Sequence, residues 1–79
     1  MEQTIKARTI LWLLDPLSFV TIIGIPEVET NPNDRPWHCG CVEDILDDTE
    51  AERWLDSEVL GLRIDCDGEQ EVYVLHKEG

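Results

Sequence analysis

Apolar and polar residues alternate along several short stretches of this chain, and each such stretch predicts a β-strand. Residues 4–14 alternate at first and then become apolar on both sides, which is typical of a strand entering a covered core. Residues 18–25, 59–66 and 70–76 place apolar side chains at every second position. The pattern therefore predicts a pair of strands at each end of the chain.

Turn residues join the strands within each pair. Asp15-Pro16 separates the first two strands, and Asp67-Gly68 separates the last two. Both connections are short, so both pairs should be antiparallel hairpins. A two-residue loop at Asp67-Gly68 places Ile64 opposite Glu71, whereas a loop one residue longer matches apolar positions with apolar positions. The sequence leaves that register open.

The middle of the chain has helical spacing with a break. Val42, Ile45 and Leu46 share one helical face, while Ala51, Trp54 and Leu55 share a nearly opposite one. One straight helix cannot bury both faces, so we expect a short helix ending near Asp47 and a second from about Glu50 to Ser57. Thr49 and Glu52 have the spacing of a capping box for the second helix.

These elements predict an α+β fold. We expect an antiparallel four-stranded sheet in β-β-α-β-β order, with one kinked or two short helices packed on it. Its 79 residues suit a single compact domain spanning 1–79. Residues 26–40 contain Pro26, Pro32 and Pro36 and are expected to form a long loop, a feature that is often functional. Trp37 lies within this loop, outside any hydrophobic periodicity that would predict its burial. It is either a lid on the core or an interface anchor.

The charge is strongly acidic and uneven. The chain has 18 acidic and 6 basic residues, a net charge of -12. Residues 1–40 carry five acids and three bases (net -2), and residues 41–79 carry thirteen acids and three bases (net -10). Such charge would repel nucleic acid and anionic membranes, and it favours a basic protein surface as partner. The alternative is that the charge only keeps the protein soluble.

Acidic residues at helical spacing form the first candidate site. Asp48, Glu52 and Asp56 stand at i, i+4 and i+8, about 6 Å apart along a helix axis. Phosphates of one DNA strand are spaced at about 3.4 Å, so mimicry of DNA would need a second acidic row on the last hairpin. The candidate partner-binding residues are Glu43, Asp44, Asp47, Asp48, Glu52, Asp56, Asp65, Asp67 and Glu69, together with Trp37.

The apolar run near the N-terminus does not predict export or membrane insertion. Lys6 and Arg8 precede ILWLL, as in a signal peptide, but Asp15-Pro16 interrupts the run and no small-residue cleavage site follows. The run is also too short to span a bilayer. Three cysteines, an odd number, favour reduced thiols. We therefore expect a cytoplasmic protein with no membrane partner.

The segment WHCGC is a candidate metal site. His38, Cys39 and Cys41, with Cys66 from the second hairpin, are good zinc ligands. The C-x-C spacing differs from that of most zinc knuckles, and no second paired motif follows, so buried or loop thiols and no cofactor are the favoured interpretation. No third group orients a Cys–His pair, and no Gly-rich phosphate loop is present. We do not expect an enzyme.

The acidic composition resembles that of phage-encoded inhibitors, the DNA-mimicking anti-restriction and anti-CRISPR proteins, and that of acidic immunity proteins that block nucleases. No motif ties the chain to one family, so no functional residues follow from the resemblance. It implies a small acidic protein-binding module that inhibits by occluding a basic nucleic-acid-binding surface. The alternatives are a zinc domain built on the four residues above, or contacts through Trp37 or a strand edge. The oligomeric state stays open.

Overall fold

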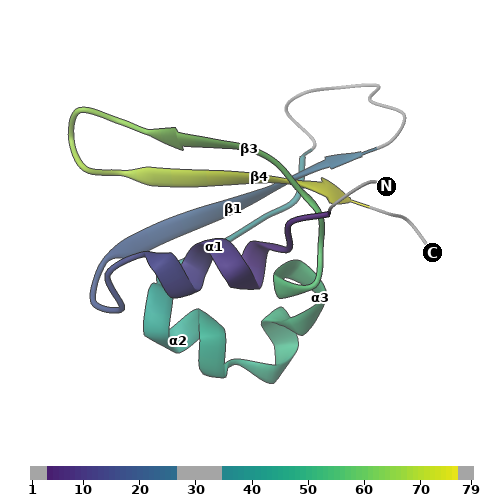
Figure 1. Ribbon diagram of the computed structural model, residues 1–79, viewed down its shortest axis with the longest axis horizontal. Coiled ribbons are helices and arrows are strands. Elements are labelled where there is room, and N and C mark those ends of the chain that lie inside the picture. The colour runs from purple at the N-terminus through teal and green to yellow at the C-terminus, as the bar shows by residue number, and fades with distance from the viewer. Residues whose placement is uncertain (1–3, 27–34, 77–79) are drawn as a thin grey trace.

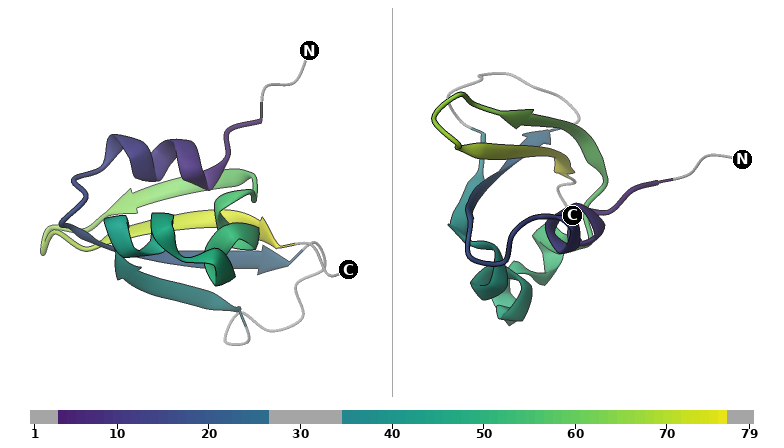
Figure 2. Two further views of the ribbon diagram at one scale, coloured as in Figure 1. Left: turned by 90° about the horizontal axis from the view of Figure 1, so that it is seen from below. Right: turned by 60° about the vertical axis from the view of Figure 1, so that its left-hand side comes forward.

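The computed structural model describes residues 4–26 and 35–76, which form one mixed sheet with helices on one face. The elements in chain order are α1 (Ala7–Leu13), β1 (Phe19–Pro26), β2 (Trp37–Cys41), α2 (Val42–Asp47), the 3-10 turn η2 (Thr49–Ala51), α3 (Glu52–Leu55), β3 (Val59–Ile64) and β4 (Gln70–His76). Figures 1 and 2 show the sheet as one layer and the helices as a second layer on one of its sides. The expected α+β class with a four-stranded sheet is confirmed.

The strand order differs from the expected one. The sheet runs β2-β1-β4-β3, with β1 antiparallel to β2, β3 antiparallel to β4, and the central strands β1 and β4 parallel. The prediction of a purely antiparallel β-β-α-β-β sheet was therefore wrong. The chain passes from the β2 edge to the β3 edge through α2, η2 and α3, which cross the same face of the sheet (Figure 2). This crossover is what allows β4 to lie parallel to β1.

The predicted first strand, residues 4–14, is wrong because most of it forms α1. Ala7, Ile10, Leu11 and Leu14 stand at i, i+3, i+4 and i+7, and these are the positions that pack on the core. Leu13, which strand alternation would bury together with Leu11, is 80% exposed. The helical spacing outweighs the alternation because the sheet offers this segment a face to pack on and no free position between its strands.

Part of the predicted loop 26–40 is also a strand. Pro26 ends β1, residues 27–34 lie outside the described residues, and Trp37–Cys41 form β2. Ile22 faces His38 and Thr21 faces Cys39 across the β1–β2 pair. The segment WHCGC has little β-propensity of its own, so its pairing with β1 is a tertiary effect that local pattern does not reveal.

The helical break expected near Asp47 falls at Asp48. This residue has an extended backbone (φ -84°, ψ 117°) between α2 and η2. Its carboxylate Oδ1 accepts a hydrogen bond from the Glu50 N–H at 2.9 Å. Asp48 is therefore the N-cap, and the capping box predicted at Thr49 and Glu52 was placed one residue late.

The last hairpin has the longer loop. Ile64 lies opposite Gln70 and Leu62 opposite Val72, so the hairpin loop runs from Asp65 to Glu69, with its three-residue turn at Cys66–Gly68. The Gly68 N–H donates to the Asp65 carbonyl at 3.0 Å, and the Asp65 N–H donates to the Glu69 carbonyl at 2.8 Å. Gly68 has a φ of +85°, the left-handed conformation that closes a three-residue hairpin after a type I turn.

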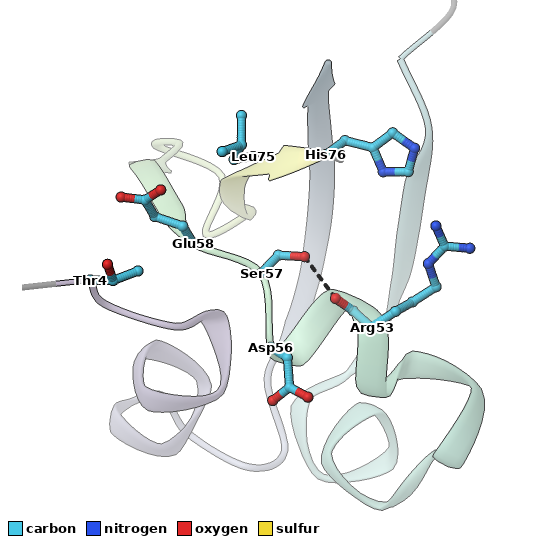
Figure 3. A pocket seen from close by; sticks show the side chains of 7 residues that line it. All are labelled: Thr4, Arg53, Asp56, Ser57, Glu58, Leu75 and His76. Carbon is cyan, nitrogen blue, oxygen red and sulfur yellow. Dashed lines mark hydrogen bonds between the residues drawn. The ribbon is translucent and has the colours of Figure 1, made fainter. Parts of the chain in front are cut away.

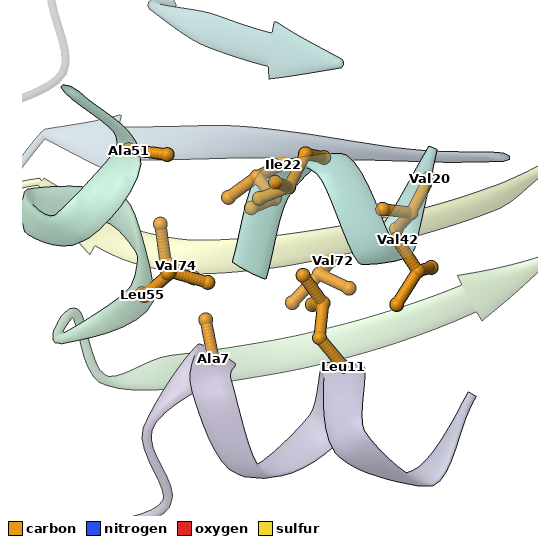
Figure 4. Close-up of a cluster of buried hydrophobic side chains, with 10 residues drawn as sticks. Ala7, Leu11, Val20, Ile22, Val42, Ala51, Leu55, Val72 and Val74 are labelled. Carbon is orange, nitrogen blue, oxygen red and sulfur yellow. The ribbon is translucent and has the colours of Figure 1, made fainter. Parts of the chain in front are cut away.

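The hydrophobic core lies between the sheet and the helices, as Figure 4 shows. Every residue of it is aliphatic, and no polar side chain of the described residues is buried with it. The buried set is Ala7, Leu11, Val20, Ile22, Val42, Ile45, Ala51, Leu55, Val72 and Val74. Since all the described helices cover this face, the opposite face of the sheet has none of them over it (Figures 1 and 2).

Candidate interaction surface

All four strands have one terminus at the same end of the sheet. Phe19 pairs with Cys41, Val20 with Gln70, and Ile64 with Gln70, so the start of β1 and β4 lies beside the end of β2 and β3. The Val42 N–H donates to the Ser18 carbonyl at 2.9 Å, and the Gln70 Nε2 donates to the Ser18 Oγ at 3.0 Å. These bonds hold the turn after α1, the start of α2 and the last hairpin together.

Acidic residues gather at this end from three separate segments. One lies in the turn after α1, two lie in the first turn of α2, and three lie in the hairpin loop between β3 and β4. We call the six residues the acidic end: Asp15, Glu43, Asp44, Asp65, Asp67 and Glu69. Like charges brought together by folding repel one another, so the arrangement opposes stability.

Four of the five basic residues among those described lie toward the other end. The backbone of Lys6 forms an isolated antiparallel β-bridge with Glu58 just before β3, and Arg35 precedes β2. Arg53 of α3 lines a pocket with His76 at the end of β4, and the Arg8 guanidinium donates to Asp56 at 3.0 Å. The exception is Arg63, near the end of β3, which lies opposite Glu71. The acidic end is thus poor in basic residues, whereas the other end holds both signs of charge, including Asp56 and Glu58.

Exposed apolar side chains accompany the acids. Leu17, in the turn after α1, is 75% exposed, Phe19 at the start of β1 is 61% exposed, and Ile64 at the end of β3 is 63% exposed. Other exposed large apolar side chains, such as Trp12, Leu13 and Trp37, lie away from the acids. Phe19 and Ile64 point to opposite faces of the sheet, because Ile64 and the buried Val20 both lie opposite Gln70 and Phe19 is next to Val20 in β1.

Five of the ten residues that the sequence pointed to belong to the acidic end: Glu43, Asp44, Asp65, Asp67 and Glu69. Four others lie along the crossover helices, and we call them, with Glu50, the ridge: Asp47, Asp48, Glu50, Glu52 and Asp56. The ridge is not a regular stripe. The Asp48 carboxylate caps η2 and lies 4.0 Å from the Nε2 of His38, and Asp56 is paired with Arg8.

Trp37 is distant from the acidic end along β2. It is the first residue of the strand, faces Ile23 of β1, and is 65% exposed. Its ring lies on the sheet face that the described helices leave uncovered, because Trp37, Cys39 and Cys41 alternate with the helix-side residues His38 and Gly40. It is exposed rather than a lid on the aliphatic core.

The strand geometry separates the four candidate zinc ligands. Cys39 and Cys41 lie on the uncovered face, and Cys66 lies in the hairpin loop. His38 lies on the helix side, where it stacks on Trp54 with ring centroids 6.3 Å apart, and His76 stacks on the same indole at 6.0 Å. The Cys41 thiol donates to the Pro16 carbonyl at 3.1 Å. Within 4–26 and 35–76, no three Cys, His, Asp or Glu side chains are arranged to hold a metal ion.

A pocket lies at the end of the sheet opposite the acidic end (Figure 3). It has a volume of about 360 Å³ and is lined by Thr4, Arg53, Asp56, Ser57, Glu58, Leu75 and His76. The Ser57 Oγ donates to the Arg53 carbonyl at 2.7 Å. The carboxylates of Asp56 and Glu58 lie in the same lining as Arg53 and His76, and Asp56 is already paired with Arg8. The pocket therefore lacks the concentrated charge that distinguishes the acidic end.

A smaller pocket of about 110 Å³ lies at the acidic end and is lined by Phe19, Thr21, Glu69 and Gln70. The sequence pointed only to Glu69 here. Phe19 sits at a strand position that alternation alone assigns to a face but not to core or solvent, and Leu17 and Asp15 lie in a turn. The sequence does show that Asp15, Leu17 and Phe19 lie next to the end of a predicted strand. Only the strand order shows that this strand end meets the others.

Among the residues that the structure describes, no helix has the length and apolarity needed to cross a membrane. Comparison of the chain with protein-family models, with curated proteins and with solved structures finds no match.

Proposed function

We propose that this protein is an inhibitory binding module that docks its acidic end on a basic, nucleic-acid-binding surface of another protein. The observation that carries the proposal is the convergence of acidic residues from three segments on one end of the sheet, away from most of the basic residues. The acidic end takes the place of the phosphates that such a surface normally binds. Nucleic acid and inhibitor then compete for one site.

The exposed apolar residues support a docked complex rather than a loose electrostatic encounter. Phe19, which is 61% exposed, would lose its water contact on docking, and an apolar side chain contributes about 1.5–3 kcal/mol when fully covered. The carboxylates of the acidic end would orient the protein on its partner and speed their association. Electrostatic steering raises association rates from about 10⁵–10⁶ to as much as 10⁸–10⁹ M⁻¹s⁻¹ at low salt.

This mechanism is that of phage-type anti-CRISPR and anti-restriction inhibitors and of nuclease immunity proteins. It requires no enzyme activity and no cofactor. We place the encounter in the cytoplasm, because Cys39, Cys41 and Cys66 are all unpaired thiols and reducing conditions keep them so. The zinc-domain alternative receives no support from the placement of His38 relative to the cysteines.

The test compares two variants with equal changes of charge. The acidic-end variant carries Glu43→Gln, Asp67→Ser and Glu69→Gln, and it spares Asp65, whose carboxylate accepts from the Cys66 N–H at 3.0 Å. The ridge variant carries Asp47→Asn, Glu50→Gln and Glu52→Gln. Ser is accepted in the turn that Asp67 occupies. All of these side chains are exposed, so both variants should fold.

Each protein is immobilised and exposed to host lysate at about 0.05 M and 1 M salt, where charges are screened over about 14 Å and 3 Å respectively. The wild type and the ridge variant should retain a basic nucleic-acid-binding protein at low salt and release it when its nucleic acid is added. The acidic-end variant should not retain it. Retention by the acidic-end variant, or retention that added nucleic acid does not affect, would refute occlusion.

A further inference from the structure

The small pocket at the acidic end has walls of two chemical kinds. Phe19, which is more than half exposed, contributes an aromatic residue from β1, and Glu69 contributes an acidic residue from the hairpin loop. Thr21 and Gln70 complete the lining from β1 and β4. At about 110 Å³ it is smaller than the pockets of about 300–1,000 Å³ that hold drug-sized ligands. It is suited to the end of a single side chain.

The one charged residue of the lining, Glu69, is acidic. The Gln70 Nε2 donates to the Ser18 Oγ at 3.0 Å and to the Phe19 carbonyl at 3.2 Å, so its donor atom is directed at β1. The Glu69 carboxylate only accepts, and the Thr21 hydroxyl can accept as well as donate. A ligand that carries several donors and a positive charge is the complement of this lining.

The guanidinium group of arginine matches it best. Its five N–H groups are spread over a flat fork, and its plane stacks on aromatic rings, whereas the lysine ammonium is a strongly hydrated point charge. Glu71 of β4 lies beside Thr21 and adds negative charge to the same region, and Arg63 of β3 faces Glu71 from the far side. Asp67 lies in the same hairpin loop as Glu69 and adds another carboxylate nearby.

We infer that this pocket receives an arginine side chain of the partner, with its guanidinium stacked on Phe19 and hydrogen-bonded by Glu69. The inference rests on the proposed function, because the arginine belongs to the basic surface that the acidic end occludes. The arginine would add one specific contact to an interface that otherwise depends on overall charge complementarity. Arginine in a pocket at the centre of an interface is among the residues that contribute most to binding.

The test uses N-acetyl-argininamide as the probe, followed by amide chemical shifts in the ¹⁵N-labelled protein. N-acetyl-citrullinamide, nearly equal in shape but uncharged, is the matched probe. We expect concentration-dependent shifts at Phe19, Thr21, Glu69 and Gln70 with the arginine probe and not with the citrulline probe. Phe19→Leu should weaken binding about two- to fivefold, which is the contribution of an exposed cation–π contact. Glu50→Gln, the control on the ridge, should leave binding unchanged.

Equal shifts with the two probes, or shifts spread over the ridge as much as over the pocket, would overturn the inference. So would a Phe19→Leu protein that binds the probe as the wild type does. The two proposals fail in different ways. If the probe does not occupy the pocket but the acidic-end variant still loses its partner, only the arginine inference is wrong. If the acidic-end variant keeps its partner, the proposed function is wrong whatever the probe does.

Discussion

Shortening Leu11 should destabilise the protein, whereas shortening Leu13 should not. Leu11 is fully buried in the core, and Leu13, two residues later in α1, is 80% exposed. Leu11→Ala removes a buried side chain and leaves a cavity, at a cost of about 2–5 kcal/mol. A domain of this size has a total stability of roughly 4–12 kcal/mol, so Leu11→Val, which removes a single methylene for about 1 kcal/mol, is the variant to measure first.

The assay is urea unfolding followed by tryptophan fluorescence, with the melting temperature from circular dichroism as a second readout. Leu11→Val should lower the melting temperature by about 4–8 °C per kcal/mol lost. Leu13→Ala should change stability by less than about 0.5 kcal/mol, as exposed substitutions do. In a strand the two leucines would share a face and behave alike. Equal losses at Leu11 and Leu13 would therefore refute the helical assignment of α1 and the core built on it.

Three further substitutions or treatments test other parts of the structure. Gly24→Ala should cost about 1–3 kcal/mol by urea unfolding, because the added Cβ would lie 3.0 Å from the His76 Cβ and 3.2 Å from the Trp54 Cζ3; an unchanged midpoint would contradict that packing. Asp48→Ala should cost about 0.5–2 kcal/mol and Thr49→Ala much less, since Asp48 provides the cap; the reverse order would restore the capping box at Thr49. Chelator should leave the circular dichroism spectrum and the melting temperature unchanged, because His38 and Cys39 lie on opposite faces of β2, whereas loss of the fold would revive the zinc domain.

The sequence predicted the elements that have a clear periodicity. The strands at 18–25, 59–66 and 70–76 correspond to β1, β3 and β4, and the helical break near Asp47 lies within one residue of its predicted place. It misassigned residues 4–14, where alternation and helical spacing coexist. In a segment that is apolar on nearly all sides, the choice between them depends on which face the rest of the protein offers.

The sequence also identified the acidic residues but not their arrangement. A regular stripe through Asp48, Glu52 and Asp56 presupposed one continuous helix, and in the structure Asp48 is a cap and Asp56 is paired with Arg8. The grouping of Asp15 with Glu43 and Glu69 depends on the strand order, which no local pattern contains. Phe19 and Leu17 were missed for the same reason, because their proximity to those acids follows from the parallel pairing of β1 with β4.

The most direct test of the proposed occlusion is competition with nucleic acid for the captured partner. The partner is bound to its own labelled nucleic acid, this protein is added, and the anisotropy of the label reports displacement. The wild type and the ridge variant should displace the nucleic acid equally. The acidic-end variant should need roughly tenfold more protein, because each of three lost surface ion pairs contributes about 0.2–1 kcal/mol. Equal displacement by the acidic-end variant, or a complex in which inhibitor and nucleic acid are bound together, would contradict the account.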